Sequence, residues 1–212
     1  ADTFWLMKKN KQAIQAWYDV VHLGRQQKHW VIVGGAGRDL TNLLLIQGRR
    51  NEGLALCEDL CRLLTDNQGH YLPLAGIPLL GLVMLHYEAN EMQRVEHCLE
   101  LAIPLCHQVG HGYFMVMGQL EQARLAYVRG DIQAAFRSLA NANKQAVQFG
   151  NKEAINLVAG ATAEFHLREG NLTAVARWAK DMGLTTSDIV QDTIPNKAYF
   201  NYIRLLLVQG KP

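Results

Sequence analysis

Apolar residues recur at helical spacing along most of the chain. Between residues 132 and 146 they follow one another at steps of three and four, which places them on one face of a helix. Residues 54–64 carry a wider apolar face, suited to burial between neighbouring helices. No clear strand-like alternation of apolar and polar residues follows Gly48. The pattern therefore predicts an all-helical structure over residues 40–182.

Glycine punctuates these helices at regular intervals. Five apolar helical runs close at Gly48, Asn90, Gly130, Gly170 and Gly210. Glycine and asparagine are the residues that most readily adopt the left-handed conformation found just after a helix. The steps between these stops are 42, 40, 40 and 40 residues. A fixed period of this length is typical of solenoid proteins, in which similar helical units stack on one another.

Further stops halve the period to about 20 residues, at Gly69, Gly110 and Gly150. One unit then consists of a first helix, a tight polar turn, a second helix of similar length and a looser turn. Asp131 and Asn171 stand in the tight turns, where their side chains are predicted to cap the helices that follow. The predicted fold is a right-handed α-α superhelix of antiparallel helix pairs, a tetratricopeptide-like solenoid with a repeat of about 40 residues.

Two stretches interrupt the rhythm, residues 30–37 and residues 183–197. The first reads Trp-Val-Ile-Val-Gly-Gly-Ala-Gly and resembles the turn of a dinucleotide-binding fold. That fold requires a third glycine where Leu40 stands, and a strand–helix–strand unit around it. We therefore interpret it as a flexible loop before a helix. The two interruptions recur about 162 residues apart (Gly48 to Gly210), and both are predicted to be long loops between helix pairs.

Composition narrows the functional classes. Apolar residues make up 49% and charged residues 19% of the chain, which predicts a folded domain, and the formal charge of +2 is too small to indicate a nucleic acid or an anionic membrane as partner. The four cysteines lie within helical patterns, which favours a reducing cytoplasm. The chain starts without methionine and stops just after an apolar helical run. We expect residues 1–212 to form a single domain, a fragment of a larger multidomain protein.

Candidate chemistry is sparse. Cys57 and Cys61 share a helix face, and histidines and cysteines gather between residues 97 and 111, so both groups could bind a metal. The two cysteines, however, fall among leucines on the apolar face, and buried free cysteine is common. Ser138 and Ser187 are the only serines, and no nucleophile–base–acid arrangement can be identified. The sequence therefore predicts a non-catalytic scaffold, with no catalytic residues, metal or cofactor.

The string Tyr-Ile-Arg-Leu-Leu-Leu-Val-Gln-Gly-Lys-Pro at residues 202–212, with its counterpart ending at Gly48, resembles the helical repeats of the large ATP-binding LuxR-type transcriptional regulators, the MalT-like family. The likeness spans nearly the whole chain. It implies a sensor superhelix placed between an ATPase and a helix-turn-helix domain. The chain departs from the tetratricopeptide consensus at Leu139 and Val147, where an aromatic residue and a proline are expected. It has no phosphate-binding Gly-x-x-x-x-Gly-Lys motif, so this part is expected to bind neither ATP nor DNA.

Tetratricopeptide arrays hold their ligands in a groove lined by the first helix of each pair. Counting back from each closing stop, and adding neighbouring charges, predicts the groove residues Arg38, Asn42, Met84, Tyr87, Glu88, Arg124, Tyr127, Glu164, Arg168 and Arg204. Such a lining could hold a sugar, an acid or a peptide. The alternative is a solvated groove whose charges pair with one another.

Two functions follow from the resemblance and the fold. In the first, the chain is the sensor and oligomerisation region of an ATP-dependent regulator, binding a small-molecule inducer and relaying the signal to domains outside this chain. In the second, it is a generic interaction module that binds a peptide or helix of a partner protein. The other domains of the same regulator are expected partners, and neither nucleic acid nor membrane is. The helix closing at Gly210 lacks a second helix, so we expect the missing chain or another copy to cover that end.

Overall fold

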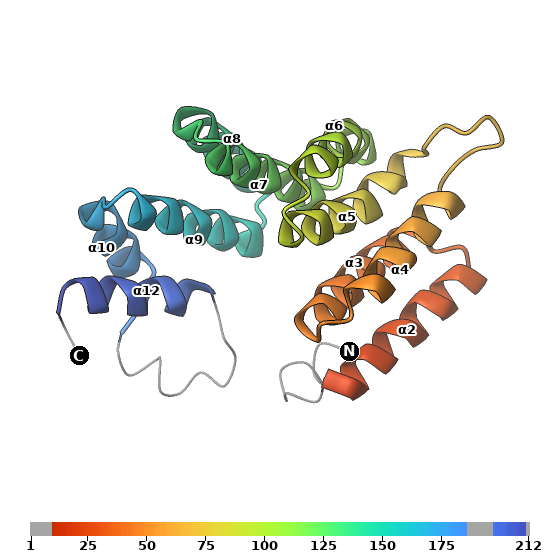
Figure 1. Cartoon of the computed structure of the whole chain (residues 1–212), viewed down its shortest axis with the longest axis horizontal. Coiled ribbons are helices and arrows are strands. Elements are labelled where there is room, and N and C mark those ends of the chain that lie inside the picture. The colour runs from red at the N-terminus through yellow and green to blue at the C-terminus, as the bar shows by residue number, and fades with distance from the viewer. Residues whose placement is uncertain (1–9, 186–196, 211–212) are drawn as a thin grey trace.

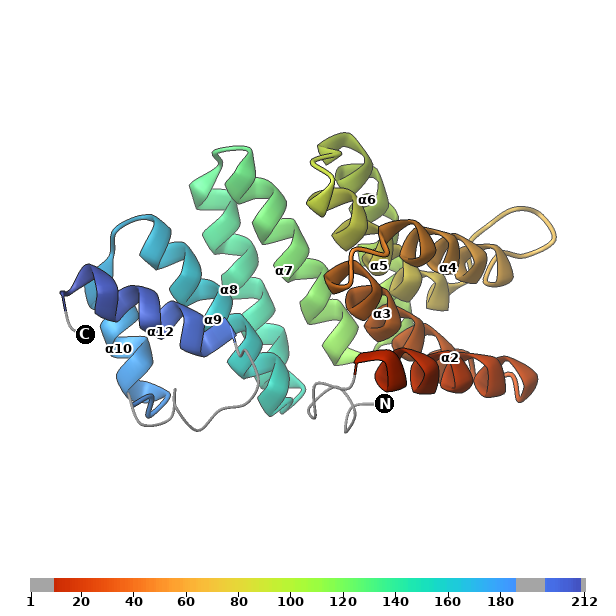
Figure 2. The same ribbon diagram turned by 60° about the horizontal axis from the view of Figure 1, so that its bottom comes forward.

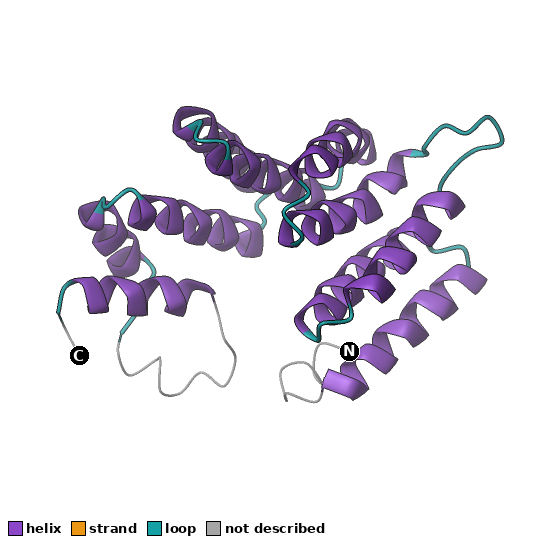
Figure 3. Cartoon of the chain, in the orientation of Figure 1, coloured by secondary structure: helices purple, strands orange, loops and turns teal. Residues whose placement is uncertain are grey.

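The computed structural model describes residues 10–185 and 197–210. Within these residues ten α-helices and one 3-10 turn account for the secondary structure, and a single β-bridge joins Thr65 to Tyr71 (Figure 3). The elements are α2 (Asn10–Gln26), α3 (Trp30–Ile46), α4 (Arg50–Leu63), η1 (Pro73–Ala75), α5 (Gly76–Glu88), α6 (Met92–Val109), α7 (Gly112–Val128), α8 (Ile132–Gln148), α9 (Lys152–Arg168), α10 (Leu172–Asp181) and α12 (Lys197–Val208).

The helices form successive hairpin pairs, α3 with α4, α5 with α6, α7 with α8 and α9 with α10, and α12 packs on the last of them. The pairs follow one another around an arch (Figure 1). The second view places α7 in the middle of the array, between α5 and α9, and α7 contacts both (Figure 2). The predicted all-helical, tetratricopeptide-like repeat is confirmed.

The turns between helices follow the predicted punctuation. The left-handed conformation occurs at Gly48, Asn90, Gly110, Gly130, Gly150, Gly170 and Gly210, among other positions. Both predicted caps are confirmed, because Asp131 and Asn171 each accept a hydrogen bond from the backbone N–H three residues on, at 2.8 and 3.1 Å. Asn151, which was not predicted, caps α9 in the same way at 3.0 Å.

The prediction of a loop at residues 30–37 is wrong, because α3 runs through this stretch without a break. The preceding stop is Lys28, with a φ of 58°. Lysine seldom adopts this conformation, so the spacing of glycine and asparagine does not reveal the stop. The glycines serve packing instead. A Cβ added to Gly37 would stand 2.4 Å from the Leu60 side chain, and one added to Gly34 would stand 3.2 Å from Ile77. They allow α3 to approach α4 and α5 closely.

One predicted helix stop, Gly69, needs correction. Gly69 does not end a helix, because α4 stops at Leu63 and Gly69 lies in the connection that follows. Asp66 orders this connection by accepting backbone hydrogen bonds from Gln68 and His70 at 2.8 and 2.9 Å. The predicted loop at 183–197 lies largely outside the described residues.

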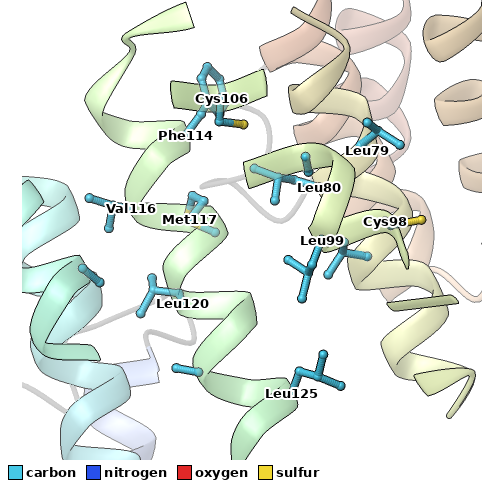
Figure 4. Close-up of a cluster of buried hydrophobic side chains, with 14 of the residues drawn as sticks. Leu79, Leu80, Cys98, Leu99, Cys106, Phe114, Val116, Met117, Leu120 and Leu125 are labelled. Carbon is cyan, nitrogen blue, oxygen red and sulfur yellow. The ribbon is translucent and has the colours of Figure 1, made fainter. Parts of the chain in front are cut away.

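The largest hydrophobic cluster lies in the middle of the array. It draws leucines, valines and cysteines from α4 to α7 and continues into α8 and α9, largely through alanines. Leu80, Leu99, Met117 and Leu120 meet there between α5, α6 and α7 (Figure 4). This continuous core fixes the position of α7. The side chains on the face of α7 that points away from the core are therefore held in place as well.

Candidate ligand-binding groove

Three cavities follow α7 from end to end, and together we call them the α7 groove. The first, the aromatic cavity, lies at the start of α7 around Tyr113, with a volume of about 530 Å³. The second, the central cavity, has a volume of about 370 Å³ and shares Tyr113 and Glu153 with the first. The third, the polar cavity of about 170 Å³, shares Arg124 and Glu164 with the second. Because neighbouring cavities share wall residues, the three adjoin one another along α7.

The polar cavity brings together seven of the predicted groove residues. Its lining contains Met84, Tyr87, Glu88, Arg124, Tyr127, Glu164 and Arg168, together with Glu121 and Phe165. They come from α5, α7 and α9, the first helices of three successive pairs. Positions 40 residues apart on such helices project in the same direction, so the period alone gathers them.

A partly buried ion pair forms part of the wall of the polar cavity. Arg124 Nη1 donates to Glu121 Oε1 at 2.7 Å, and the two side chains are 25% and 6% exposed. The negative charge of Glu121 raises the pKa of the Arg124 guanidinium above its ordinary value. Glu121 was not predicted, although its spacing of three residues from Arg124 on one helix is a usable signal. The pair fixes Arg124 and satisfies a carboxylate that would otherwise be buried alone.

An aromatic and charged cluster forms the rim of the polar cavity. Arg168 Nη2 donates to Glu164 Oε1 at 2.7 Å, and its guanidinium lies 5.5 Å from the centre of the Tyr127 ring. Tyr127 packs against Phe165 with ring centres 4.5 Å apart, and its hydroxyl donates to Glu169 Oε1 at 2.7 Å. Burial raises the pKa of Tyr127, and the hydrogen bond to Glu169 acts in the same direction. The ring is therefore held at a fixed angle beside the cavity.

The aromatic cavity holds Arg38 and Asn42, the two predicted residues from α3. Arg38 lies 6.0 Å from the centre of the Tyr113 ring, and its Nη1 is 3.5 Å from Asp39 Oδ1. Trp17 from α2 and His111 complete the aromatic wall. Tyr113 was not predicted, because it stands in the first turn of α7, far from the stop used for counting.

Arg204 is placed apart from the other predicted residues. It lies on α12, where it is exposed, and it lines none of the three cavities. Helix α12, which follows the fourth pair, packs on α9 and α10. The groove does not extend to it.

The cysteines are packing residues, as predicted for Cys57 and Cys61. All four thiols are free and buried, and burial raises the pKa of Cys57, Cys61 and Cys106 to about 12 and that of Cys98 to about 11. They therefore remain protonated near neutral pH. Within the described part of the chain, no group of three or more histidine, cysteine or acidic side chains is placed to hold a metal ion.

The family described as the MalT-like TPR region matches residues 3–212. No curated protein matches the chain. Within residues 10–185 and 197–210, no helix combines the length and apolar character needed to cross a membrane.

Proposed function

The chain belongs to the family of MalT-like TPR regions, and from this membership we propose that it is the sensor region of a bacterial ATP-dependent LuxR-type transcriptional regulator. In this role it binds a small-molecule inducer and catalyses no reaction. The signal passes to ATPase and DNA-binding domains outside this chain. The free, buried cysteines support a reducing cytoplasm as its compartment.

The α7 groove is the observation that carries the proposal. Small-molecule sites are typically concave, about 300–1,000 Å³ in volume, and combine apolar or aromatic walls with a few fixed polar groups. The aromatic and central cavities, at about 530 and 370 Å³, match that description. Tyr113 and Met117 supply apolar walls, while Arg124 and Glu164 supply polar groups held by neighbours.

The position of the groove suggests how a bound ligand acts on the rest of the regulator. Its walls come from α2, α3, α5, α7 and α9, which belong to successive parts of the array. A ligand that contacts several of these helices favours the curvature of the superhelix in which those contacts are best. A change of curvature moves both ends of a solenoid, and that movement is the relay we propose to the adjoining domains.

One observation favours a second candidate, a peptide-binding module. α7 has 17 residues, so a groove that follows it is about 25 Å long. That length would accommodate about seven residues of an extended peptide at about 3.4 Å each. A partner segment is therefore the alternative occupant of the same groove.

A thermal-shift screen of the 212-residue chain against metabolites tests the proposal. A ligand present at a hundredfold excess over its Kd stabilises the folded state by about 2.7 kcal/mol. We expect Tyr113→Ala, which removes a wall shared by the aromatic and central cavities, to abolish or reduce the shift. Tyr71→Ala is the matched control, because Tyr71 is exposed and lies outside the groove. A shift that survives Tyr113→Ala would place the site outside these two cavities, and a response to peptides alone would favour the second candidate.

A further inference from the structure

The lining of the α7 groove carries more negative than positive charge. Its charged residues are Arg38, Arg124, Arg168, Asp39, Glu88, Glu121, Glu153 and Glu164. Three guanidinium groups against five carboxylates leave a formal charge of −2, although the whole chain has a formal charge of +2. The groove is thus a locally acidic surface on a weakly basic protein.

All three arginines of the groove are already paired. Arg124 bonds to Glu121 and Arg168 to Glu164, each at 2.7 Å, while Arg38 stands 3.5 Å from Asp39. An anionic ligand would have to compete with these carboxylates for the same guanidinium groups. The arrangement therefore disfavours anions as ligands, in spite of the three arginines.

Two carboxylates of the groove remain without a cation. Glu88 and Glu153 are both exposed, and neither forms an ion pair within the part of the chain that the structure describes. Glu153 lies in the wall shared by the aromatic and central cavities, and Glu88 lies in the wall of the polar cavity. The groove thus offers one uncompensated negative charge near each of its ends.

Tyrosine rings stand beside both of these carboxylates. Tyr113 lines the same two cavities as Glu153, and Tyr87 and Tyr127 line the same cavity as Glu88. Burial raises the pKa of Tyr113, the charge of Arg38 opposes this rise, and Glu153 raises the pKa by a smaller amount. A tyrosine face next to a carboxylate is a typical setting for a bound organic cation.

The protein's own side chains already occupy such rings. The guanidinium of Arg38 lies 6.0 Å from the centre of the Tyr113 ring, and that of Arg168 lies 5.5 Å from the centre of the Tyr127 ring. Both distances are within the range at which a ring attracts a cation. These rings therefore attract positive charge, but a ligand cation at Tyr113 or Tyr127 would have to displace an arginine. Tyr87 is the tyrosine of the groove over which the described part of the chain places no cation.

We propose that the α7 groove binds a small organic cation, with a protonated amine or quaternary ammonium group seated over the Tyr87 ring against Glu88 and attracted along the groove by Glu153. This inference rests on the proposed function, since it names the chemical class of the inducer. Coulombic attraction to the two free carboxylates selects the ligand, and the apolar walls around Met117 and Leu120 hold its aliphatic part.

Calorimetric titration of the 212-residue chain with three probes of equal length tests the inference. The probes are 1,8-diaminooctane, 1,8-octanediol and octanedioate, which are cationic, neutral and anionic. We expect the diamine to bind saturably, at least tenfold more tightly than the other two, and to bind more weakly as salt is raised. The double variant Glu88→Gln/Glu153→Gln should weaken the diamine at least tenfold. Glu58→Gln on α4 is the matched control, an exposed glutamate outside the groove that should change nothing.

Each other outcome overturns the inference in a distinguishable way. Equal or tighter binding of the diol or the dioate, lost in Tyr87→Ala, would overturn the cationic class while leaving the proposed sensor function intact. Binding of the diamine that the double variant does not weaken would place the cation elsewhere. Binding of pentalysine without binding of the diamine would point to a partner peptide instead. Circular dichroism and the Tm of the double variant show that it is folded, as expected for two exposed positions.

Discussion

Helices α5 and α9 hold the same place in their pairs, two repeats apart, yet they are packed very differently. Ten of the 13 residues of α5 are buried, against five of the 17 residues of α9. α5 contacts η1, α3, α4, α6 and α7, and so is enclosed on nearly every side. α9 contacts α7, α8, α10 and α12, but its face toward the central cavity stays open. The α7 groove therefore has one closely packed wall and one open wall.

Side-chain size separates the two helices further. The buried residues of α5 include Ile77, Leu79, Leu80, Leu82, Val83 and Leu85. Those of α9 are Ala154, Val158, Gly160, Ala163 and Phe165. A further cavity of about 550 Å³, which is separate from the α7 groove, also borders α9, between α8 and α10. Because α9 has open space on two sides, we expect movements that close the groove on a ligand to occur there, and α5 to stay fixed.

Loss of a leucine should have its largest effect in α5. Leu85 is fully buried in the main core, so Leu85→Ala should destabilise the protein by about 3 kcal/mol through lost burial and an unfilled cavity. Leu157 in α9 is half-buried and borders the central cavity, so Leu157→Ala should cost only about 1 kcal/mol. Urea denaturation of the two variants measures both values. Equal losses would contradict the distinction between a packed and an open wall.

A matched pair of glycines tests the same distinction with a smaller change. A Cβ at Gly81 in α5 would stand 2.6 Å from Cys57 Sγ, so Gly81→Ala should destabilise by about 1–3 kcal/mol. At Gly160 in α9 no described atom lies within 4 Å of an added Cβ. Gly160→Ala should therefore stabilise by about 0.5–1 kcal/mol, because alanine favours helix and restricts the unfolded chain. Thermal unfolding measures both shifts.

The double variant Gly81→Ala/Cys57→Ala is the control for the first of these changes. Removing the sulfur atom removes the clash, so the added methyl group should cost less in a Cys57→Ala background than in the wild type. The same methyl cost in both backgrounds would show that the sulfur is not the obstacle.

The order of helices could be predicted from the sequence because their ends depend on local chemistry. A left-handed residue after a helix and a cap before the next are properties of a few neighbouring residues, as at Gly130 and Asp131. The role of a residue that contacts parts of the chain far away in the sequence could not be predicted in this way. Gly34 and Gly37 look like loop residues, but their role is to admit Ile77 and Leu60 from other helices.

The candidate site was predictable to the same degree. The 40-residue period predicts that Met84, Arg124 and Glu164 lie together, and they line one cavity because equivalent positions on stacked helices face the same way. The period does not predict Tyr113, because the place of this residue in the groove depends on the curvature that brings α3 near the start of α7. Curvature is set by the sizes of side chains packed between helices, which spacing alone does not show.

The turns that follow α5 and α9 should also differ in how their contribution to folding stability depends on pH. This is the smallest of the expected differences. After α9, the neutral Asn171 caps the next helix, whereas the equivalent position after α5 is Glu91. Its carboxylate is 2.5 Å from His86 Nδ1 and 3.2 Å from Arg50 Nη2, and the hydrogen bond from His86, followed by the charges of Arg50 and Arg94, lowers the pKa of Glu91.

Because the folded-state pKa of Glu91 is lowered, its contribution to stability is present above the unfolded value near 4.5 and is lost as the pH falls through the lower folded value. Glu91→Gln should therefore lower the Tm at pH 6, and the difference from the wild type should shrink as the pH falls below about 4.5. Thermal unfolding from pH 6 to pH 3 measures this, with the exposed Glu58→Gln as control. A Tm difference that stays constant over that range would show that the ion cluster at the α5 turn contributes no pH-dependent stability.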